Sequence, residues 1–192
     1  FVGASAGVNY SSTSTGPEAI IIGRNAVGNT TTSGVGLLAI GHEALYNNTG
    51  TYNLALGTQA LFSNTSGSFN HYIGYKSGLA NLSGSDNTVF GYQTMQASTI
   101  TSYNTIMGSE AYKYGTGVGE NALFGYRCGY TGVSSYNAAV GCLSLTNGGI
   151  SNAVLGYGAM RYKPKTCIGN VAIGDSALAS TGSALYNIGI GY

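Results

Sequence analysis

The acidic side chains are the first candidates for chemistry, because a pair of carboxylates can cleave a glycosidic bond. The chain has six of them: Glu18, Glu43, Asp86, Glu110, Glu120 and Asp175. Glu43 and Glu110 occupy equivalent positions of a repeat, four repeats apart, which corresponds to about 19 Å at a strand spacing of about 4.8 Å. Glycoside hydrolysis uses carboxyl groups about 5 to 9.5 Å apart. We therefore predict that the protein is not an enzyme, with a pair assembled across a subunit boundary as the alternative. Glu110 is predicted to form an exposed ion pair with Arg127, one repeat later.

Metal, cofactor and thiol chemistry are not indicated either. His42 and His71 fall at different repeat positions and have no metal-ligand spacing. No phosphate-binding loop or nucleophile motif is present, so no cofactor is expected. The odd number of cysteines argues against a disulfide framework, although one disulfide between coils is an alternative. The cysteines are Cys128, Cys142 and Cys167, and Cys128 stands where other repeats carry a small residue, so we expect it to pack in the core.

The tyrosines offer a binding chemistry, since each ring can present an apolar face and a hydroxyl to a sugar. One set follows the repeat glycine at a corner predicted to face water, and we take it as the candidate glycan- or receptor-binding set: Tyr75, Tyr92, Tyr126 and Tyr157. The alternative is axial packing of these rings that only stiffens a rod. A second set precedes the repeat asparagine and is expected to brace the opposite corner: Tyr52, Tyr103, Tyr136 and Tyr186.

A repeat of 15 to 18 residues positions all these side chains. Its eleven copies are centred on Gly23, Gly41, Gly57, Gly74, Gly91, Gly108, Gly125, Gly141, Gly156, Gly174 and Gly191. Four residues before the glycine, nine copies carry asparagine: Asn53, Asn70, Asn87, Asn104, Asn121, Asn137, Asn152, Asn170 and Asn187. Ala19 and Leu37 take that position in the first two copies. The residue before the glycine is always apolar, and the third residue after it is always small.

A unit of about 17 residues is too short for a helical hairpin repeat and fits two short strands and two turns. The glycine predicts a tight corner or a close backbone approach, and the asparagines predict a stacked ladder. We therefore predict an all-β, parallel β-solenoid of about eleven coils. Residues 1–19 are expected to be an irregular start with a partial first repeat, and residues 20–192 the solenoid. A turn-rich segment at 11–17 and a basic segment at 161–165 are expected to be solvated loops.

The composition gives no indication of nucleic-acid binding or of a membrane span. Charged residues make up 7% of the chain, against about 25% in a typical globular domain. The net charge of +1 gives no indication of nucleic-acid binding, and no apolar run approaches the ~20 residues of a membrane span. Because the chain starts and stops inside a repeat, we expect it to be a segment of a longer array.

Two neighbouring apolar columns predict contact between chains. The residues one and two before the glycine alternate in direction along a strand, so one column points into the coil and the other points out. Both are largely apolar, so the outward column needs cover from a neighbouring chain. The residues alone do not say which column is inward. We predict that Ile173→Asp, directly before Gly174, destabilises the local coils by several kcal/mol, because it buries an unpaired charge in the stack.

Residues 38–45, 54–61 and 171–178 read Leu-Ala-Ile-Gly-His-Glu-Ala-Leu, Leu-Ala-Leu-Gly-Thr-Gln-Ala-Leu and Val-Ala-Ile-Gly-Asp-Ser-Ala-Leu. This pattern resembles the YadA-like head repeats of trimeric autotransporter adhesins and the similar repeats of phage and viral tail fibres, over about residues 18–192. The resemblance implies a left-handed parallel β-roll, three chains about a common axis, and binding to a cell surface from an extracellular or virion-surface location. Longer Asn-Thr-Gly-rich loops and many tyrosines favour the fibre branch.

We expect a fibrous attachment protein that forms a rigid homotrimeric rod with a receptor- or glycan-binding surface. One alternative is a structural subunit that polymerises end to end into a filament without binding a ligand. Another is a tailspike enzyme, which the missing carboxylate pair disfavours. A third is a monomeric solenoid that binds ice or a flat lattice. That function requires a regular threonine plane, whereas the threonines are scattered over columns, as at Thr58, Thr88, Thr94 and Thr105.

Overall fold

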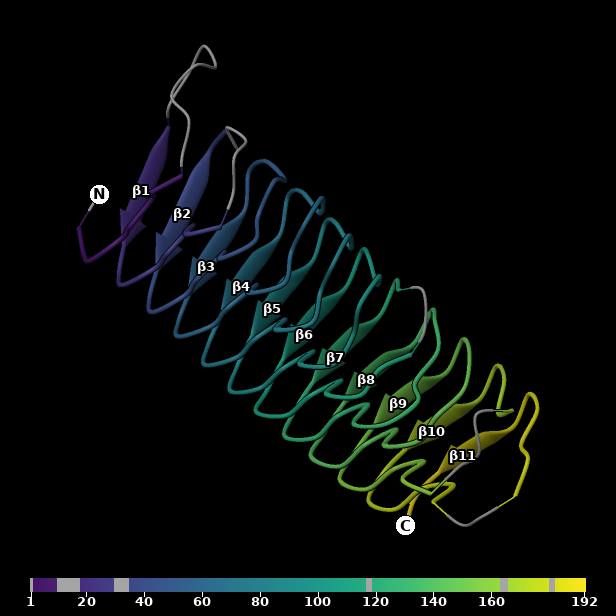
Figure 1. The fold of residues 1–192 in the computed structure, drawn as a ribbon. Helices are drawn as coiled ribbons and strands as arrows, with labels where there is room; N and C mark the ends of the chain where they lie inside the picture. The colour runs from purple at the N-terminus through teal and green to yellow at the C-terminus, as the bar shows by residue number, and fades with distance from the viewer. Residues whose placement is uncertain (1, 10–17, 30–34, 117–118, 163–165, 180–181) are drawn as a thin grey trace.

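The computed structural model describes residues 2–9, 18–29, 35–116, 119–162, 166–179 and 182–192. It contains eleven short strands: β1 (Ala19–Ile22), β2 (Leu37–Ile40), β3 (Leu54–Leu56), β4 (His71–Ile73), β5 (Thr88–Phe90), β6 (Thr105–Met107), β7 (Ala122–Phe124), β8 (Ala138–Val140), β9 (Ala153–Leu155), β10 (Val171–Ile173) and β11 (Ile188–Ile190). Each strand pairs in parallel with the next one along the chain, so the strands form a single row between the two ends (Figure 1). This arrangement confirms the parallel β-solenoid.

The stack already includes the first described residues. Val2 pairs in parallel with Ile22, and the Gly23 N–H donates to the Val2 carbonyl at 2.7 Å. The Gly7 N–H donates to the Ala26 carbonyl at 2.9 Å. Residues 2–9 therefore form a partial repeat that stacks on the coil made of β1 and the turn that follows it. The predicted loop at 11–17 and residues 163–165 of the basic segment lie outside the described residues.

In the described residues, each coil contains one strand, and turns replace the second strand that the sequence predicted. The reason is the backbone: the second and fourth residues after the repeat glycine are left-handed, with φ of 56° at Glu110 and 50° at Tyr112. A strand cannot contain such residues. The turns still pair with both neighbouring coils, since the Glu110 N–H donates to the Tyr92 carbonyl and the Tyr112 N–H to the Cys128 carbonyl. The prediction of two strands is therefore wrong, but the backbone groups are satisfied.

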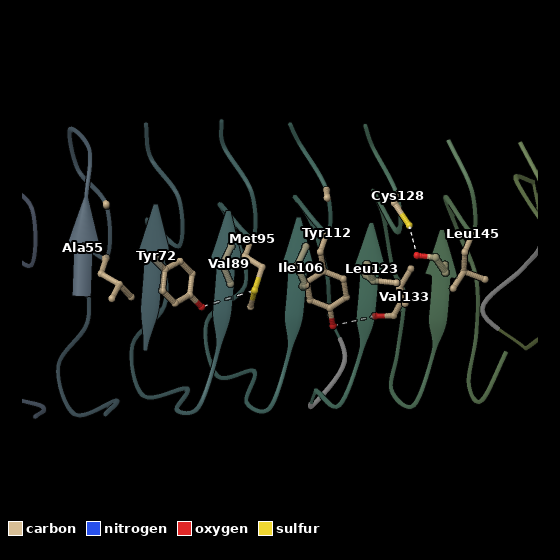
Figure 2. Close-up of a cluster of buried hydrophobic side chains, with 14 of the residues drawn as sticks. Ala55, Tyr72, Val89, Met95, Ile106, Tyr112, Leu123, Cys128, Val133 and Leu145 are labelled. Atoms are coloured by element: carbon tan, nitrogen blue, oxygen red, sulfur yellow. Dashed lines mark hydrogen bonds between the residues drawn. The ribbon is translucent and has the colours of Figure 1, made fainter. Parts of the chain in front are cut away.

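The core is a narrow column of side chains between the sheet and the turns (Figure 2). The residue two before each repeat glycine points inward from the strand, and the third and fourth residues after the glycine point inward from the turn. Tyr72 and Met95 are fully buried members, and the Tyr72 hydroxyl donates to the Met95 sulfur at 3.7 Å. The Tyr112 hydroxyl donates to the Val133 carbonyl at 3.3 Å. Each coil contributes few core residues, so stacking is what makes the core continuous.

Size compensation explains two glycines that interrupt the large apolar column in the turns. A Cβ added at Gly78 would lie 2.3 Å from the ring of Tyr72, the inward strand residue of the same coil. A Cβ added at Gly129 would lie 2.7 Å from the Cδ1 atom of Leu123. In these two coils the turn therefore contributes no side chain beside a large strand residue, which avoids overpacking of the core.

The structure settles which apolar column of the strand points inward. Ala172 is fully buried, whereas its neighbour Ile173 is 39% exposed on the outer face of the sheet. The residue before the repeat glycine is thus the outward one, throughout the strands. The prediction that Ile173→Asp buries a charge in the stack is wrong, because it assigned the column of Ile173 as inward, whereas the inward column is that of Ala172.

The repeat asparagines form a buried ladder. The Asn121 Oδ1 accepts from the N–H and the Nδ2 of Asn137, both at 3.1 Å. The Asn121 Nδ2 donates to the Asn104 Oδ1 at 3.1 Å and to the Ser134 carbonyl at 3.0 Å. Equivalent bonds join all nine successive members from Asn53 to Asn187. An amide such as that of Asn121 therefore links its own corner to the coils on both sides.

The repeat glycine marks the closest approach between coils. The nine glycines from Gly41 to Gly174 have φ between 128° and 146°, a region that essentially only glycine adopts. A Cβ added at Gly108 would lie 2.2 Å from the carbonyl oxygen of Gly125 in the next coil. The glycine column is thus required both by the backbone conformation and by the stacking distance.

Candidate functional site

An apolar stripe runs along the outer face of the sheet. It consists of the residues directly before the repeat glycine, each at least partly exposed: Ile22, Ile40, Leu56, Ile73, Phe90, Met107, Phe124, Val140, Leu155, Ile173 and Ile190. Neighbouring members are partners in the strand pairing, as Phe90 is with Met107. The eleven strands are separated by ten spacings, so the stripe is about 48 Å long. Contiguous apolar surface on this scale marks an interaction site.

A shallow apolar hollow of about 240 Å³ lies on the stripe where β8, β9 and β10 meet. In β8 and β9 the neighbouring outward column carries alanines, Ala138 and Ala153, which leave space beside the larger stripe residues. Its main lining residues are Ala138, Val140, Ala153, Leu155, Val171 and Ile173. A side chain from a partner surface could enter this hollow.

The candidate tyrosines after the repeat glycine lie on the exposed corner that follows the strand. Tyr75, Tyr92, Tyr126 and Tyr157 are all exposed. The rings of Tyr75 and Tyr92 stack, with centroids 5.4 Å apart and planes at 14°. The Nζ atom of Lys76 lies 5.2 Å from the Tyr75 centroid. The structure therefore brings two of the four tyrosines together, beside a cation.

The other two tyrosines stand apart from that pair. Ser109 takes the equivalent position between Tyr92 and Tyr126, and Cys142 takes it between Tyr126 and Tyr157. The Arg127 guanidinium lies 5.1 Å from the Tyr126 centroid. The tyrosines at this corner thus do not form a continuous row, and cations lie over two of the rings. The ring surface that could stack on sugars is therefore smaller than that of four free tyrosine rings.

The opposite corner carries a second row, which we call the ring-and-acid column. It consists of the residues directly before the repeat asparagine position: Glu18, Gly36, Tyr52, Phe69, Asp86, Tyr103, Glu120, Tyr136, Ser151, Gly169 and Tyr186. From Gly36 onward each has a φ between 55° and 67°. Tyr52 and Phe69 stack at 5.2 Å, and the Tyr52 ring also packs over Gly36. Tyr52 thus braces its neighbours, whereas bracing by Tyr103 and Tyr136 stays a prediction. All four tyrosines of this column are exposed, which the sequence did not indicate.

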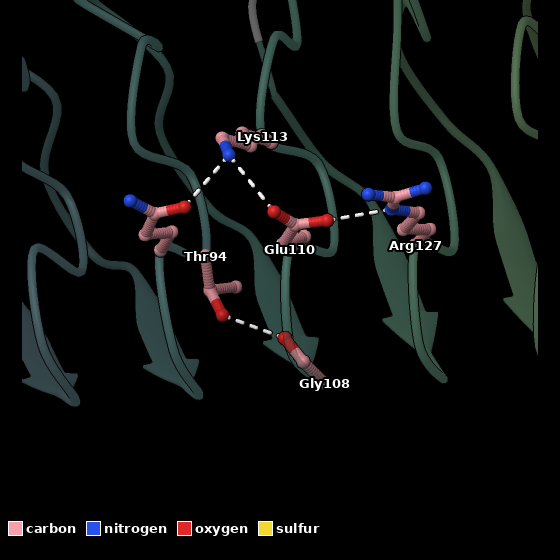
Figure 3. A network of polar contacts seen from close by, with 6 residues as sticks. Thr94, Gly108, Glu110, Lys113 and Arg127 are labelled. Atoms are coloured by element: carbon pink, nitrogen blue, oxygen red, sulfur yellow. Dashed lines mark hydrogen bonds and ion pairs between the residues drawn. The ribbon is translucent and has the colours of Figure 1, made fainter.

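Glu110 lies at the centre of a polar network rather than in a simple exposed pair (Figure 3). The Arg127 Nε donates to the Glu110 Oε2, and the Lys113 Nζ donates to the Glu110 Oε1 at 2.9 Å and to the Gln93 Oε1 at 2.7 Å. The Glu110 side chain is only 14% exposed, so the prediction of an exposed pair is wrong in its burial. The hydrogen bonds from Lys113 and then Arg127 hold the pKa of Glu110 below its usual value.

The remaining candidates stay separate in the described part of the chain. Glu43 accepts a hydrogen bond from Gln59 at 2.8 Å and belongs to a different cluster from Glu110. The described residues contain no group of three or more His, Cys, Asp or Glu side chains that could hold a metal ion. Cys128 is buried, its thiol contacts the Ser144 hydroxyl at 3.2 Å, and burial raises the pKa of that thiol to about 11. All three cysteines are free. No described helix has the length and apolarity to cross a membrane.

Comparison of the chain with protein-family models, with curated proteins and with solved structures finds no match.

Proposed function

We propose that the protein is a fibrous surface-attachment protein whose solenoid assembles into a rigid homotrimeric rod that presents a receptor- or glycan-binding surface. The observation that supports this best is the apolar stripe. It places a large side chain on the outer face of every strand, at about 4.8 Å intervals along the whole stack. Water is a poor solvent for such a surface, so covering it drives association.

The spacing of the stripe favours a second copy of the chain as its cover. A partner that fills the stripe along its full length needs apolar groups with the same spacing, and another solenoid of this sequence has them. A closed ring of three chains about one axis covers every stripe without leaving an open end. Three chains are also the number that the resemblance to adhesin and fibre heads implies. The hollow at Val140, Leu155 and Ile173 would take a neighbour's side chain.

The attachment role rests on what such a rod leaves facing outward. The corner that follows the strand presents the stacked Tyr75 and Tyr92 rings next to Lys76, which is a combination of apolar face, hydroxyl and cation suited to sugars carrying acidic groups. An extracellular or virion-surface location belongs to this proposal.

Light scattering coupled to size exclusion tests the assembly. A mass near three times 19.5 kDa is expected for the native protein. Met107→Asp, in the middle of the stripe, should reduce the mass to that of one chain. Leu82→Asp makes the same type of change at an exposed residue of a loop and should leave the trimer intact. A monomeric native protein would refute the rod, and species far above a trimer would favour an end-to-end filament instead.

The binding role needs its own test, on protein whose mass is unchanged. Tyr92→Ala should lower retention on immobilised sialylated or sulfated glycans, because it removes one ring of the stacked pair. Tyr52→Ala removes an equally exposed ring from the opposite corner and serves as the control. Equal loss in both variants, or none in either, would remove Tyr75 and Tyr92 as the binding surface.

A further inference from the structure

The ring-and-acid column contains an open groove of about 400 Å³ in its central part. Tyr103 and Tyr136 form its two ends, Glu120 stands between them, and Ala122 and Ala138 line its floor. Tyr103 and Tyr136 are 64% and 55% exposed, so their rings are available to a ligand. The volume falls within the range of small-molecule sites, about 300 to 1,000 Å³.

The spacing of the two rings leaves room for one inserted group. Where aromatic residues of this column occupy adjacent coils, as Tyr52 and Phe69 do, their rings stack at 5.2 Å. Tyr103 and Tyr136 are two coils apart, which is about 9.6 Å at the usual strand spacing. The coil between them contributes the thin carboxylate of Glu120 instead of a ring. A group midway between the rings would thus lie about 4.8 Å from each one.

The charge of the column selects the class of ligand. Glu18, Asp86 and Glu120 are three of the six acidic residues of the chain, and the column contains no lysine or arginine. Among the described residues, no basic side chain forms an ion pair with Glu120. A cation within about 6 Å of a tyrosine ring is attracted to its face. Both rings and the carboxylate therefore favour the same positively charged group.

We propose that this groove binds an alkylammonium group, with Tyr103 and Tyr136 on its two sides and the Glu120 carboxylate as its counter-ion. The alkyl carbons next to the nitrogen contact the ring faces and the alanine floor, while the charge is balanced by Glu120. Surface chemistries that carry such a group include choline headgroups and amino sugars with a free amine. The site borders the hollow on the apolar stripe, with which it shares Ala138, and it does not use the Tyr75 and Tyr92 corner.

Nuclear magnetic resonance titration with labelled tyrosine tests the groove, with choline chloride as the first probe. The expected result is a saturable shift of the Tyr103 and Tyr136 ring signals. The neutral carbon analogue of choline, in which a tert-butyl group replaces the trimethylammonium group, should give a much weaker shift. Glucosamine in place of choline separates the two sources, since saturation by glucosamine alone would identify a primary amine of an amino sugar as the ligand group. Equal shifts from choline and its neutral analogue, with none from glucosamine, would overturn the proposal.

Substitutions locate the binding. Tyr136→Leu should raise the dissociation constant for choline about two- to fivefold, the size expected of one cation–π contact at an exposed site. Glu120→Gln should raise it by a similar factor, as expected for an exposed ion pair. Asp175→Asn removes an exposed carboxylate from the opposite corner and should change nothing. Unchanged affinity in Glu120→Gln would refute the role of the carboxylate, whatever the oligomeric state of the protein proves to be.

Discussion

Replacing a repeat glycine by alanine should be far more damaging than its small size suggests. In Gly108→Ala the new Cβ would lie 2.2 Å from the Gly125 carbonyl oxygen, and ordinary contact begins at 3.4 Å, so the atoms must separate by about 1.2 Å. That movement disturbs two hydrogen bonds between the coils, from Gly125 to Met107 and from Arg127 to Ser109. At about 1 kcal/mol for each bond, and about 1 to 3 kcal/mol for alanine in this backbone region, the expected loss is about 3 to 5 kcal/mol.

Two other glycines provide matched controls. At Gly158 φ is 61°, and a Cβ would meet nothing closer than the Ser176 hydroxyl at 3.6 Å. Other copies carry larger residues there, so Gly158→Ala should cost about 1 kcal/mol. At Gly191 φ is 120° and a Cβ would have no atom within 4 Å, so Gly191→Ala isolates the backbone cost. Chemical unfolding followed by circular dichroism, with hydrogen exchange to locate the damage, compares the three variants. A loss for Gly108→Ala no larger than that for Gly158→Ala would refute the close-approach argument.

Three further predictions follow from the packing and the charges. Ala172→Asp should destabilise the protein by several kcal/mol, because it buries an unpaired charge. Ile173→Asp in the same strand should leave the unfolding of the single chain nearly unchanged, because Ile173 points outward. Equal losses of stability in thermal unfolding would contradict the assignment of the two columns. Tyr72→Ala should destabilise the protein by about 2 to 5 kcal/mol by opening a cavity, and Gly78→Leu should do so by a similar amount by overpacking the core. The double variant should recover most of that loss in urea unfolding. Additive losses would argue against size compensation. The pKa of Glu110 is lower in the folded protein, so the contribution of its carboxylate to stability is present above about pH 4.5 and disappears as the pH falls through the lowered pKa. The difference in melting temperature between the native protein and Glu110→Gln should therefore shrink on acidification. A difference that does not depend on pH would exclude this coupling.

The coil period and the strand register could be predicted from the sequence, because they are fixed by positions that all or nearly all copies fill with the same residue. Glycine at Gly108 is required by a close backbone contact, and the Asn104 and Asn121 amides bond only when they are in register. Such positions tolerate little substitution, so they stand out in eleven aligned copies. The inward and outward columns could not be separated in the same way. Ala172 and Ile173 are both apolar, and the core takes the smaller residue because the turn fills the remaining space.

Other features depend on contacts that no repeat column reveals. The left-handed turns carry ordinary side chains such as Glu110 and Tyr112 instead of glycine, the usual signal of this conformation, so the sequence predicted a second strand there. Lys113 joins Glu110 from a position outside the compared columns. The groove at Tyr103 and Glu120 arises from the alternation of rings and acids across coils, a pattern visible only when this column is read along the rod axis.

The most direct test of the rod is whether its stripe is covered in solution. The three methionines of the chain differ in exposure and can therefore report on the stripe. Met95 and Met160 are fully buried within the single chain, whereas Met107 on the stripe is 51% exposed. Peroxide oxidises accessible methionine to the sulfoxide, and mass spectrometry of peptides measures the rate at each site. If copies of the chain cover the stripe, Met107 should be nearly as protected as Met95 and Met160, and Phe90→Asp should expose it. Rapid oxidation of Met107 in the native protein, with Met95 and Met160 still protected, would show an uncovered stripe and contradict the trimeric rod.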